Sequence, residues 1–456
     1  MAKKYDFKYI VIGSGPAGSA AALTLIKSKK RVALVEGRFY GGSNLNTRDL
    51  PYKVALDFSH TYAKINTYPE FKNQDFSFNF STIAARELNT ITKSGGNDKK
   101  IFEDAGIVCI DGYANFLDQH TIAIGQQKIT AEYFIIATGS NLKTLGIAGT
   151  EHVDFLTPNT AIRARRLPKV ITVVGGGSTG CEIAEYYAEL GAKVLILETS
   201  DQLLPREDKE VGEVISNYFT RRLGISVLTS CKVVSLEEDN FSKYVVFQTE
   251  GTEKMIRTET IILATGSEPV TDFGLENADV KYKKSGIIVN KLFQTSSKNI
   301  YAVGDCLGGE SSTERAYQEG LTVAINLVNK TKTAINYKGM SRLVNTCPEV
   351  ATVGLNENDL LRRDCKFKKA IIKLDETTAS KIYNFNYGFV KLLVDKNSHI
   401  LGATIVAPNA SLMIGELSLA IRHDLSTLEL ASTPHVNNAF SEVIKLAAKK
   451  LLPKKH

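Results

Sequence analysis

The sequence predicts an α/β protein with two parallel sheets. An apolar strand, a glycine-rich turn, a helix and a second apolar strand occur twice in the same order, from residues 8 and 169 onward. Each copy is followed by an apolar strand that ends in a small-residue turn, IIATGS at 135–140 and ILATGS at 262–267. A chain of 456 residues, 43% of them hydrophobic, has room for about three folded domains.

The repeated phrase has the glycine spacing of a Rossmann-like dinucleotide-binding fold. The first glycine permits a tight turn, the second lets backbone amides approach a pyrophosphate, and the third lets helix and strand pack closely. An acid follows the third glycine by 18 residues in both copies and is placed to accept hydrogen bonds from a ribose. The residues are Gly13, Gly15, Gly18 and Glu36 in the first copy and Gly175, Gly177, Gly180 and Glu198 in the second. Two such phrases predict electron transfer between two bound cofactors.

Glu198 indicates which nicotinamide cofactor the second phrase prefers. A carboxylate that faces the 2′-phosphate of NADP would be a like-charge contact, which costs several kcal/mol. The residues at 199–202 contain no arginine to compensate for it. The sequence therefore predicts NAD rather than NADP.

Charge and composition exclude several other classes of protein. The formal net charge of +7 is a small excess over a large surface and does not indicate nucleic-acid binding. No apolar stretch approaches the ~18 residues of a membrane span. The N-terminus passes directly into a strand, so we expect a cytoplasmic protein without stable membrane insertion. The six cysteines are scattered, with no CxxC pair, and predict neither a disulfide framework nor a metal site.

The order of the motifs resembles that of the class I pyridine nucleotide-disulfide oxidoreductases, the family of dihydrolipoamide dehydrogenase, glutathione reductase and mercuric reductase. The resemblance covers both glycine phrases, a loop at 41–53, both ATG turns, the GD motif of TSSKNIYAVGDC and the segment VNTCPEVATVGL. It implies an α/β fold like that of glutathione reductase, with two Rossmann-like domains and an α+β C-terminal dimerisation domain. We expect an FAD-binding domain at 1–155 and 268–335, an NAD-binding domain at 156–267, a dimerisation domain at 336–456, and hence a homodimer.

The resemblance also implies roles for individual residues. Lys53 resembles the lysine beside flavin N5, and Glu182 resembles the acid that pairs with it and meets the nicotinamide carboxamide. A buried ion pair also has a purely structural reason to persist. The other residues expected to contact FAD are Gly13, Gly15, Gly18, Glu36, Ser43, Gly112, Thr138, Gly139 and Asp305. Those expected to contact NAD are Gly175, Gly177, Gly180, Glu198, Val233 and Gly266.

Two departures from the family pattern bear on the chemistry. Relatives carry GGTCLNxGCxPSK in the loop, whereas this chain has GGSNLNTRDLPYK, with Asn44 and Asp49 in place of the two redox-active cysteines. Relatives end in HPTLSE, whereas TPHVNNAFSE keeps the glutamate as Glu442 but has Asn437 in place of the catalytic histidine. Thiol–disulfide exchange needs a thiolate, and an amide is no base near neutral pH. The sequence therefore predicts that disulfide reduction by the family's route is absent.

The roles of three residues in this altered site stay open. Asp49 either exchanges the proton that accompanies hydride transfer or is a hydrogen-bonding residue of the loop. His435, two residues before Asn437, either replaces the missing base or points elsewhere. Cys347 is expected on the flavin side of the folded dimer.

The sequence thus predicts an NADH-dependent FAD oxidoreductase of the diaphorase type. NADH would reduce the flavin, which would pass electrons directly to a small acceptor such as a quinone in the space vacated by the disulfide. Two alternatives remain. One is a transhydrogenase-like enzyme that exchanges hydride between two nicotinamides, and the other is a non-catalytic flavin-binding redox sensor.

Overall fold

The structure, a computed structural model, describes residues 5–71, 74, 76–143, 145–240 and 242–452. Within it the chain divides into two compact units. The first unit consists of Met1–Val54, Thr82–Lys143 and Gly266–Tyr337, and the second of Ala55–Ser81, Thr144–Thr265 and Lys338–His456. The boundaries of the three domains expected from the sequence stay a prediction.

The first unit is organised around a seven-stranded sheet with the order β3-β2-β1-β6-β5-β4, in which β18 also pairs with β6. Strands β3, β2, β1, β6 and β18 run parallel, and β5 and β4 continue the sheet in antiparallel fashion. Val11 pairs with Leu34 on one side and Ile135 on the other, so the apolar runs of the sequence form a buried parallel core. The strands are β1 (Phe7–Ile12), β2 (Val32–Glu36), β3 (Val108–Asp111), β4 (Ala114–Asp118), β5 (Thr121–Ile124), β6 (Gln127–Ile136) and β18 (Ile300–Ala302).

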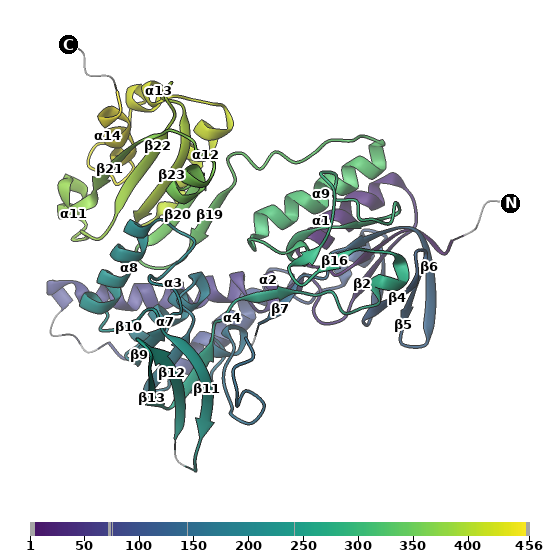
Figure 1. The fold of residues 1–456 in the computed structure, drawn as a ribbon, viewed down its shortest axis with the longest axis horizontal. Coiled ribbons are helices and arrows are strands. Elements are labelled where there is room, and N and C mark those ends of the chain that lie inside the picture. The colour runs from purple at the N-terminus through teal and green to yellow at the C-terminus, as the bar shows by residue number, and fades with distance from the viewer. Residues whose placement is uncertain (1–4, 72–73, 75, 144, 241, 453–456) are drawn as a thin grey trace. The chain divides into compact units, whose positions relative to one another are not determined.

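Helices α1 (Pro16–Leu25) and α9 (Thr313–Asn329) pack against each other in this unit (Figure 1). Their close approach depends on Gly320, because a Cβ there would lie 2.0 Å from the carbonyl oxygen of Ala17. Other helices are α2 (Gly42–Asn46), α3 (Asp49–Thr67), which continues into the second unit, α4 (Phe80–Lys93) and α5 (Lys100–Asp104). Short strand pairs are β7 (Ser140–Leu142) with β15 (Ser267–Pro269) and β16 (Tyr282–Lys283) with β17 (Gly286–Ile287).

The second unit repeats the parallel arrangement with four strands in the order β10-β9-β8-β14. These strands are β8 (Val170–Val174), β9 (Lys193–Leu197), β10 (Ser226–Leu228) and β14 (Thr260–Leu263). Helix α7 (Ser178–Glu189) connects β8 to β9, and α8 (Lys209–Arg222) connects β9 to β10. An antiparallel meander of β11 (Lys232–Glu238), β12 (Lys243–Thr249) and β13 (Thr252–Thr258) follows, and α6 (Pro158–Ala161) precedes the sheet.

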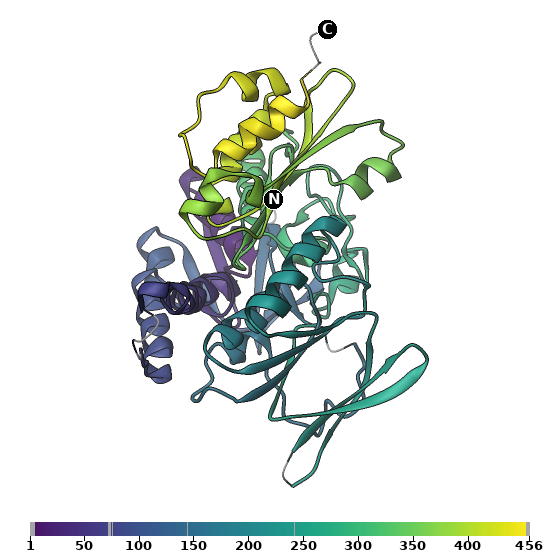
Figure 2. The same cartoon turned by 90° about the vertical axis from the view of Figure 1, so that its left-hand side faces the viewer.

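The C-terminal part of the second unit is an antiparallel sheet with helices packed on it (Figure 2). Its order is β19-β20-β23-β22-β21, and its buried residues include Val390, Leu392 and Ile405. The strands are β19 (Ser341–Val344), β20 (Glu349–Gly354), β21 (Lys368–Lys373), β22 (Phe389–Val394) and β23 (Ile400–Ala407). The helices are α10 (Glu357–Arg362), α11 (Thr378–Ile382), α12 (Ala410–Arg422), α13 (Thr427–Ser432) and α14 (Glu442–Lys450).

Short 3₁₀ helices occupy Ile26–Ser28, Pro69–Phe71, Leu275–Ala278, Gly304–Leu307 and Leu374–Glu376. The predicted fold class, with two Rossmann-like sheets and a separate α+β C-terminal part, is confirmed. In the ranges that the structure describes, no helix is both long enough and apolar enough to cross a membrane.

Candidate functional site

The first glycine-rich loop joins β1 to α1 and leaves the start of the helix open. Gly13 has a φ of 97°, and a Cβ there would lie 2.3 Å from the carbonyl oxygen of Ala137. A Cβ on Gly18 would lie 1.8 Å from the carbonyl oxygen of Gly13, whereas one on Gly15 would meet nothing within 4 Å. No side chain caps α1. Its first amide groups are therefore available to an anion in the space beside Gly15.

The second glycine-rich loop, between β8 and α7, repeats this geometry. Gly175 has a φ of 109°, and its Cβ would lie 2.4 Å from the carbonyl oxygen of Ala264. A Cβ on Gly180 would lie 1.9 Å from the carbonyl oxygen of Gly175, and one on Gly177 would meet nothing within 4 Å. Helix α7 also starts without a side-chain cap. Both loops therefore fit the pyrophosphate of a dinucleotide.

Glu36 and Glu198, at the ends of the second strands, fasten those strands to the loops. Glu36 Oε2 accepts hydrogen bonds from the amide of Ser14 at 2.9 Å and from its hydroxyl at 2.5 Å. Glu198 Oε2 accepts from the amide of Gly176 at 2.5 Å, and its Oε1 accepts from the amide of Ser200 at 2.7 Å. A carboxylate offers about four acceptor positions. Both acids thus keep capacity for a ribose hydroxyl.

Two more residues expected to contact FAD, Ser43 and Gly112, lie close to the first loop, and Gly42 beside Ser43 touches it. Gly42 has a φ of 68°, and a Cβ there would lie 2.5 Å from the Cα of Gly15, so the two loops are in direct backbone contact. Gly112 donates its N–H to the carbonyl oxygen of Glu36 at 2.8 Å, which places it at the end of β2. Ser43 is half-buried, and its carbonyl oxygen accepts two backbone hydrogen bonds of 2.8 Å that shape the turn.

The side chains at the two positions where the resembled family has cysteines touch each other. Asn44 Nδ2 donates to Asp49 Oδ2 at 3.3 Å and to Thr313 Oγ1 at 2.7 Å. Lys53 Nζ lies 3.2 Å from Asp49 Oδ1. Amide, carboxylate and ammonium thus form one connected polar chain. Sequence reasoning missed Thr313, which is 269 residues from Asn44 and carries no motif of its own.

Asp305 lies in the 3₁₀ helix Gly304–Leu307 and contacts the same loop. Its Oδ2 accepts hydrogen bonds from Ser140 Oγ at 3.2 Å and Ser311 Oγ at 3.0 Å, and Arg48 Nη1 lies 3.7 Å away. Arg48 also donates to Ser140 Oγ at 3.4 Å. The structure thus brings Asp305 to Ser140, the last residue of the first ATG turn, and to the loop residue Arg48, contacts that the sequence did not predict.

The residues of the ATG turns have open backbones. Gly139 and Gly266 have φ values of 72° and 89°, and a Cβ on either would meet nothing within 4 Å. Thr138 Oγ1 donates to the carbonyl oxygen of Val270 at 3.4 Å. Val233, on β11, is half-buried. The glycines therefore offer the close approach expected beside a bound cofactor, and the specific contacts stay predictions.

Glu182, on α7, binds the chain that follows β19. Its Oε1 accepts hydrogen bonds from the backbone amide of Asn345 at 2.7 Å and from Asn345 Nδ2 at 2.9 Å. Lys53 has Asp49 as its partner within the first unit. The expected pair of Lys53 with Glu182 joins residues of different units and stays a prediction.

Two buried acids further along α7 were not singled out by the sequence. Glu185 is fully buried, and both its oxygens accept the amide of Cys347 at 3.0 Å. Burial raises the pKa of Glu185 well above its usual range and that of Glu189 to about 8. The only sequence signal for this pair is a four-residue spacing that puts both side chains on one helix face, and that spacing is too common to identify a site.

Four of the six cysteines have a raised thiol pKa. All six are free thiols. Burial raises the pKa of Cys109, Cys181 and Cys347, and it raises that of Cys306 to about 12. A thiol with a raised pKa provides little thiolate near neutral pH. Cys365 is the exposed one, at a position without a family motif.

The C-terminal loop arranges its polar residues differently from the family pattern. Glu442 Oε2 accepts a hydrogen bond from the amide of Asn438 at 3.1 Å, and Asn437 is exposed. His435 Nε2 lies 3.2 Å from Glu416 Oε2, and its Nδ1 faces a backbone carbonyl. His435 is thus held by a glutamate of α12, and its role as a substitute base stays a prediction.

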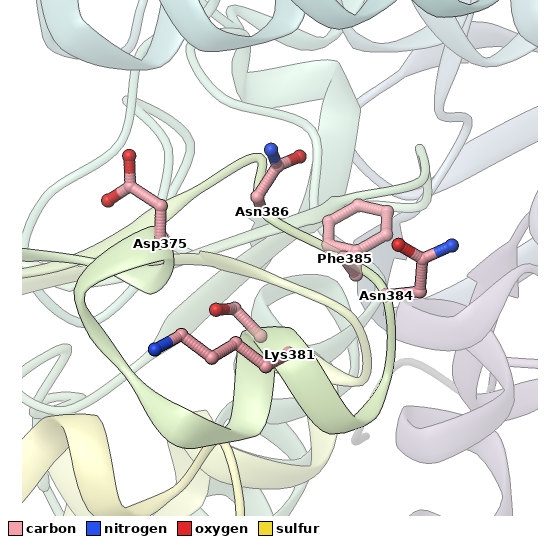
Figure 3. Close-up of a pocket in the computed structure, with 6 residues that line it drawn as sticks. Asp375, Lys381, Asn384, Phe385 and Asn386 are labelled. Atoms are coloured by element: carbon pink, nitrogen blue, oxygen red, sulfur yellow. The ribbon is translucent and has the colours of Figure 1, made fainter.

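A hollow of about 300 Å³ lies in the C-terminal part of the second unit (Figure 3). It contains none of the residues that the sequence predicts to be functional. Its lining residues are Asp375, Ser380, Lys381, Asn384, Phe385 and Asn386. The side chains of Lys381 and Asp375 provide one charge of each sign, so the hollow favours no particular class of ligand.

Comparisons with known proteins cover nearly the whole chain. Residues 7–320 match the family model described as pyridine nucleotide-disulphide oxidoreductase, and residues 340–448 match its dimerisation domain. A mercuric reductase from Bacillus cereus is 29% identical, over 97% of this chain and 71% of its own length. A dihydrolipoyl dehydrogenase from Geobacillus stearothermophilus is 29% identical, over 96% of this chain and 95% of its own length.

Two solved structures have a similar fold. The HOCl-induced flavoprotein disulfide reductase RclA from Escherichia coli superposes with a TM-score of 0.86 at 23% identity, over 98% of this chain and 100% of the other. LpdA from Mycobacterium tuberculosis superposes with a TM-score of 0.87 at 23% identity, over the same shares. At this level of identity, the likeness supports the fold alone.

Proposed function

Because this chain belongs to the pyridine nucleotide-disulphide oxidoreductase family, we propose that it is an NADH-dependent flavoprotein oxidoreductase that reduces a small acceptor without a cysteine relay. Members of the family bind FAD and NAD(P)H. When bound, FAD supplies the redox chemistry, because it can accept hydride from a reduced nicotinamide and pass electrons onward. The open glycine loops at uncapped helix starts and the acids at the strand ends fit both cofactors.

The observation that carries the proposal is the polar chain of Thr313, Asn44, Asp49 and Lys53. These side chains are joined by contacts of 2.7, 3.3 and 3.2 Å. An amide and a carboxylate form no disulfide and no thiolate, so this loop offers no covalent route for electrons. The raised pKa of Cys181, Cys306 and Cys347 supports the same conclusion for these three thiols.

The polar chain also suggests what the loop does instead. Asp49 Oδ2 lies 3.4 Å from Lys53 Nζ and 3.3 Å from Asn44 Nδ2, so the carboxylate is held between two donors. In our proposal the proton that accompanies reduction of the acceptor comes from Lys53 Nζ, which Asp49 holds in place. A flat organic oxidant such as a quinone suits this arrangement, because it needs electrons and protons but no nucleophile.

The choice of NADH follows from the second glycine phrase. Glu198 is buried and bonded to the amides of Gly176 and Ser200, which fixes its carboxylate at the end of β9. A 2′-phosphate there would meet a negative charge without a compensating arginine nearby in sequence. We expect NADPH to reduce the protein at least tenfold more slowly than NADH, roughly the effect of one unfavourable charge contact. Equal rates would favour the transhydrogenase alternative.

We also propose that the enzyme is a homodimer. The match of residues 340–448 to the family's dimerisation domain supports it. The exposed apolar side chains of Leu412 and Leu419, on one face of α12, are available for such an interface. Sedimentation of the purified protein should give the mass of two chains.

The decisive experiment is an anaerobic NADH titration of the FAD-loaded protein followed by absorbance. We expect each chain to take up two electrons and to show no long-wavelength thiolate-to-flavin band. The double variant Asn44→Cys/Asp49→Cys provides a matched positive control, because it restores the two sulfur positions of the family. It should gain that band and take up four electrons. Four-electron uptake by the unmodified chain would contradict the proposal, as would flavin that stays oxidised under excess NADH.

Single substitutions distinguish a role of the loop at 41–53 in flavin reduction from a role of the cysteines. Lys53→Met removes the ammonium beside Asp49 and should slow flavin reduction by about ten- to a hundredfold, the usual cost of disturbing one positioned group. Cys347→Ser should leave the rate unchanged, because its thiol has a raised pKa. Equal losses in both variants would argue for a thiol in the reaction.

A further inference from the structure

Two clusters in the second unit gather acidic side chains. The first, the Lys391 cluster, consists of Asp208, Glu210, Glu357 and Lys391. Lys391 is fully buried, and its Nζ lies 2.9 Å from Asp208 Oδ2 and 3.0 Å from Glu210 Oε2 and also contacts Glu357. The ammonium fills the centre of this cluster. It leaves no place for another cation.

The second, the His60 cluster, consists of His60 from α3 and Glu185 and Glu189 from α7. His60 Nε2 lies 3.6 Å from Glu185 Oε2 and 3.8 Å from Glu189 Oε2. The ligand atoms of the three residues all lie within 4.8 Å of one another. Glu185 is fully buried and Glu189 is 8% exposed. Three potential metal ligands thus converge on one buried point.

Two atoms that face this point lack hydrogen-bond partners. Neither His60 Nε2 nor Glu189 Oε2 forms a hydrogen bond. Buried polar atoms of native proteins are paired with few exceptions, and each exception requires an explanation. The lone atoms lie on opposite sides of the 3.8 Å gap between imidazole and carboxylate. A ligand in that gap would satisfy both.

The charges around the cluster also favour the binding of a cation. Among the described residues, no lysine or arginine forms an ion pair with Glu185 or Glu189. Glu182, one helical turn before Glu185, adds negative charge, and the hydrogen bonds that Glu185 accepts come from the neutral amide of Cys347. Burial of uncompensated carboxylates is costly. An imidazole alone offsets at most one of them.

The spacing of the ligand atoms suits a small divalent cation. Zinc binds imidazole nitrogen and carboxylate oxygen at ~2.0–2.2 Å in tetrahedral geometry, which sets neighbouring ligand atoms ~3.4 Å apart. The two distances from His60, 3.6 and 3.8 Å, need only a small contraction, and the ligand atoms of the two glutamates lie within 4.8 Å of each other. One nitrogen and two oxygens also favour zinc, cobalt, nickel or copper over magnesium and calcium, which prefer oxygen ligands alone.

We propose that His60, Glu185 and Glu189 form a binding site for a divalent transition-metal cation of the zinc type. It has three protein ligands and leaves a position for water. The proposal departs from the sequence expectation of no metal site, which considered only cysteine spacing. It does not depend on the proposed hydride chemistry, since none of the three residues is among those expected to contact FAD or NAD.

A cobalt titration of the full-length, FAD-loaded protein tests the site after treatment with a chelator. We expect one Co²⁺ per chain, with visible d–d bands of a low-coordinate site after subtraction of the flavin spectrum, and displacement by Zn²⁺. His60→Gln and Glu189→Gln should each weaken binding at least tenfold, by analogy with the 10- to 100-fold loss known even for residues that only support ligands. His399→Gln is the matched control, because His399 has a side chain that is 42% exposed and paired with Asp395 outside the cluster. It should bind Co²⁺ like the unmodified chain.

Two results would overturn the proposal. One is the absence of a saturable Co²⁺ site, and the other is unchanged binding in His60→Gln. A measurement on the unmodified chain covers the case in which the variants fail to fold. Bound Co²⁺ should shift the NMR signals of one imidazole far outside the normal range, and a Co²⁺ complex without such a signal would exclude His60 as a ligand.

Discussion

The Lys391 cluster and the His60 cluster bury carboxylates in the same unit but differ in the source of positive charge. In the Lys391 cluster a fully buried ammonium of β22 contacts three acids. In the His60 cluster two buried acids of α7 face one imidazole and an unpartnered gap. Both groups have the residue types of a metal site. They differ in that the chain supplies a fully buried ammonium to the first cluster, whereas no described lysine or arginine pairs with the acids of the second.

The difference shows that a cluster of acids is not evidence for a ligand. The cost of burial has to be offset in both places, since a buried ion without a partner costs several kcal/mol. A lysine offsets this cost of burial at all times, whereas a metal ion offsets it only while the ion is bound. The stability of the two clusters should therefore respond in different ways to substitution, metal and pH.

The largest effect is expected for Lys391→Met. It leaves three acids without their central cation and should lower the free energy of unfolding by ~3–5 kcal/mol, as for a broken buried ion pair. Urea titration of the metal-free protein measures it. Lys369→Met is the matched control, since Lys369 contacts the same Glu357 but has a side chain that is 44% exposed. Its loss should stay below about 1 kcal/mol. Similar losses in both variants would mean that Lys391 is not the centre of the cluster.

The second effect is stabilisation by zinc through the His60 cluster. A ligand at 100 times its Kd raises the free energy of unfolding by about 2.7 kcal/mol if it binds only the folded state. We expect this gain in the unmodified chain and its absence in Glu189→Gln, measured as thermal shifts with and without Zn²⁺. The Lys391→Met variant should keep the gain, because its cluster contains no zinc site. Loss of the zinc stabilisation in Lys391→Met would show that the two clusters are coupled.

The third effect is a loss of stability at acidic pH that is caused by protonation of the acids in the Lys391 cluster. Burial opposes ionisation of Glu210, but hydrogen bonds and the charge of Lys391 outweigh it and lower the pKa of this carboxyl. A carboxyl with a lowered pKa stabilises the folded state above its unfolded pKa, and that stability is lost as the pH falls through the folded value. Stability should therefore decrease below about pH 4.3, the ordinary pKa of glutamate. Unfolding midpoints as a function of pH should show a shallower acid slope in Lys391→Met.

The smallest effect is expected for Glu189→Gln without metal. Burial raises the pKa of Glu189 to about 8, so near neutral pH the side chain is mostly protonated and glutamine replaces it with little change of charge or shape. The free energy of unfolding should therefore change by less than about 1 kcal/mol. Urea titration in the presence of a chelator measures it. A loss of several kcal/mol would show that the glutamate already has a full partner in the chain.

The sequence was sufficient for the elements that depend on local pattern. The glycine phrases predicted both loops, because Gly18 and Gly180 leave no room for a Cβ against Gly13 and Gly175. The acids Glu36 and Glu198 were found by their spacing from the glycines. Such motifs can be recognised in a sequence because the residues that form them lie within about 30 residues of one another.

The sequence was not sufficient for contacts that the fold makes between distant segments. Nothing near Asn44 indicates that Thr313 will accept its hydrogen bond. Nothing near His60 indicates that α7 will bring two acids to its imidazole, because each residue alone is ordinary in an amphipathic helix. Asp49 and Asn44 could be identified as substitutions, but their mutual hydrogen bond required the structure.

The exposure of Cys365 has a practical consequence. The other five thiols are buried or partly buried, so the native chain has one natural attachment point for a maleimide dye. That point follows α10, whose first residue, Glu357, contacts Lys391. A fluorophore on this thiol would therefore report the loosening of that helix during refolding, without an engineered cysteine.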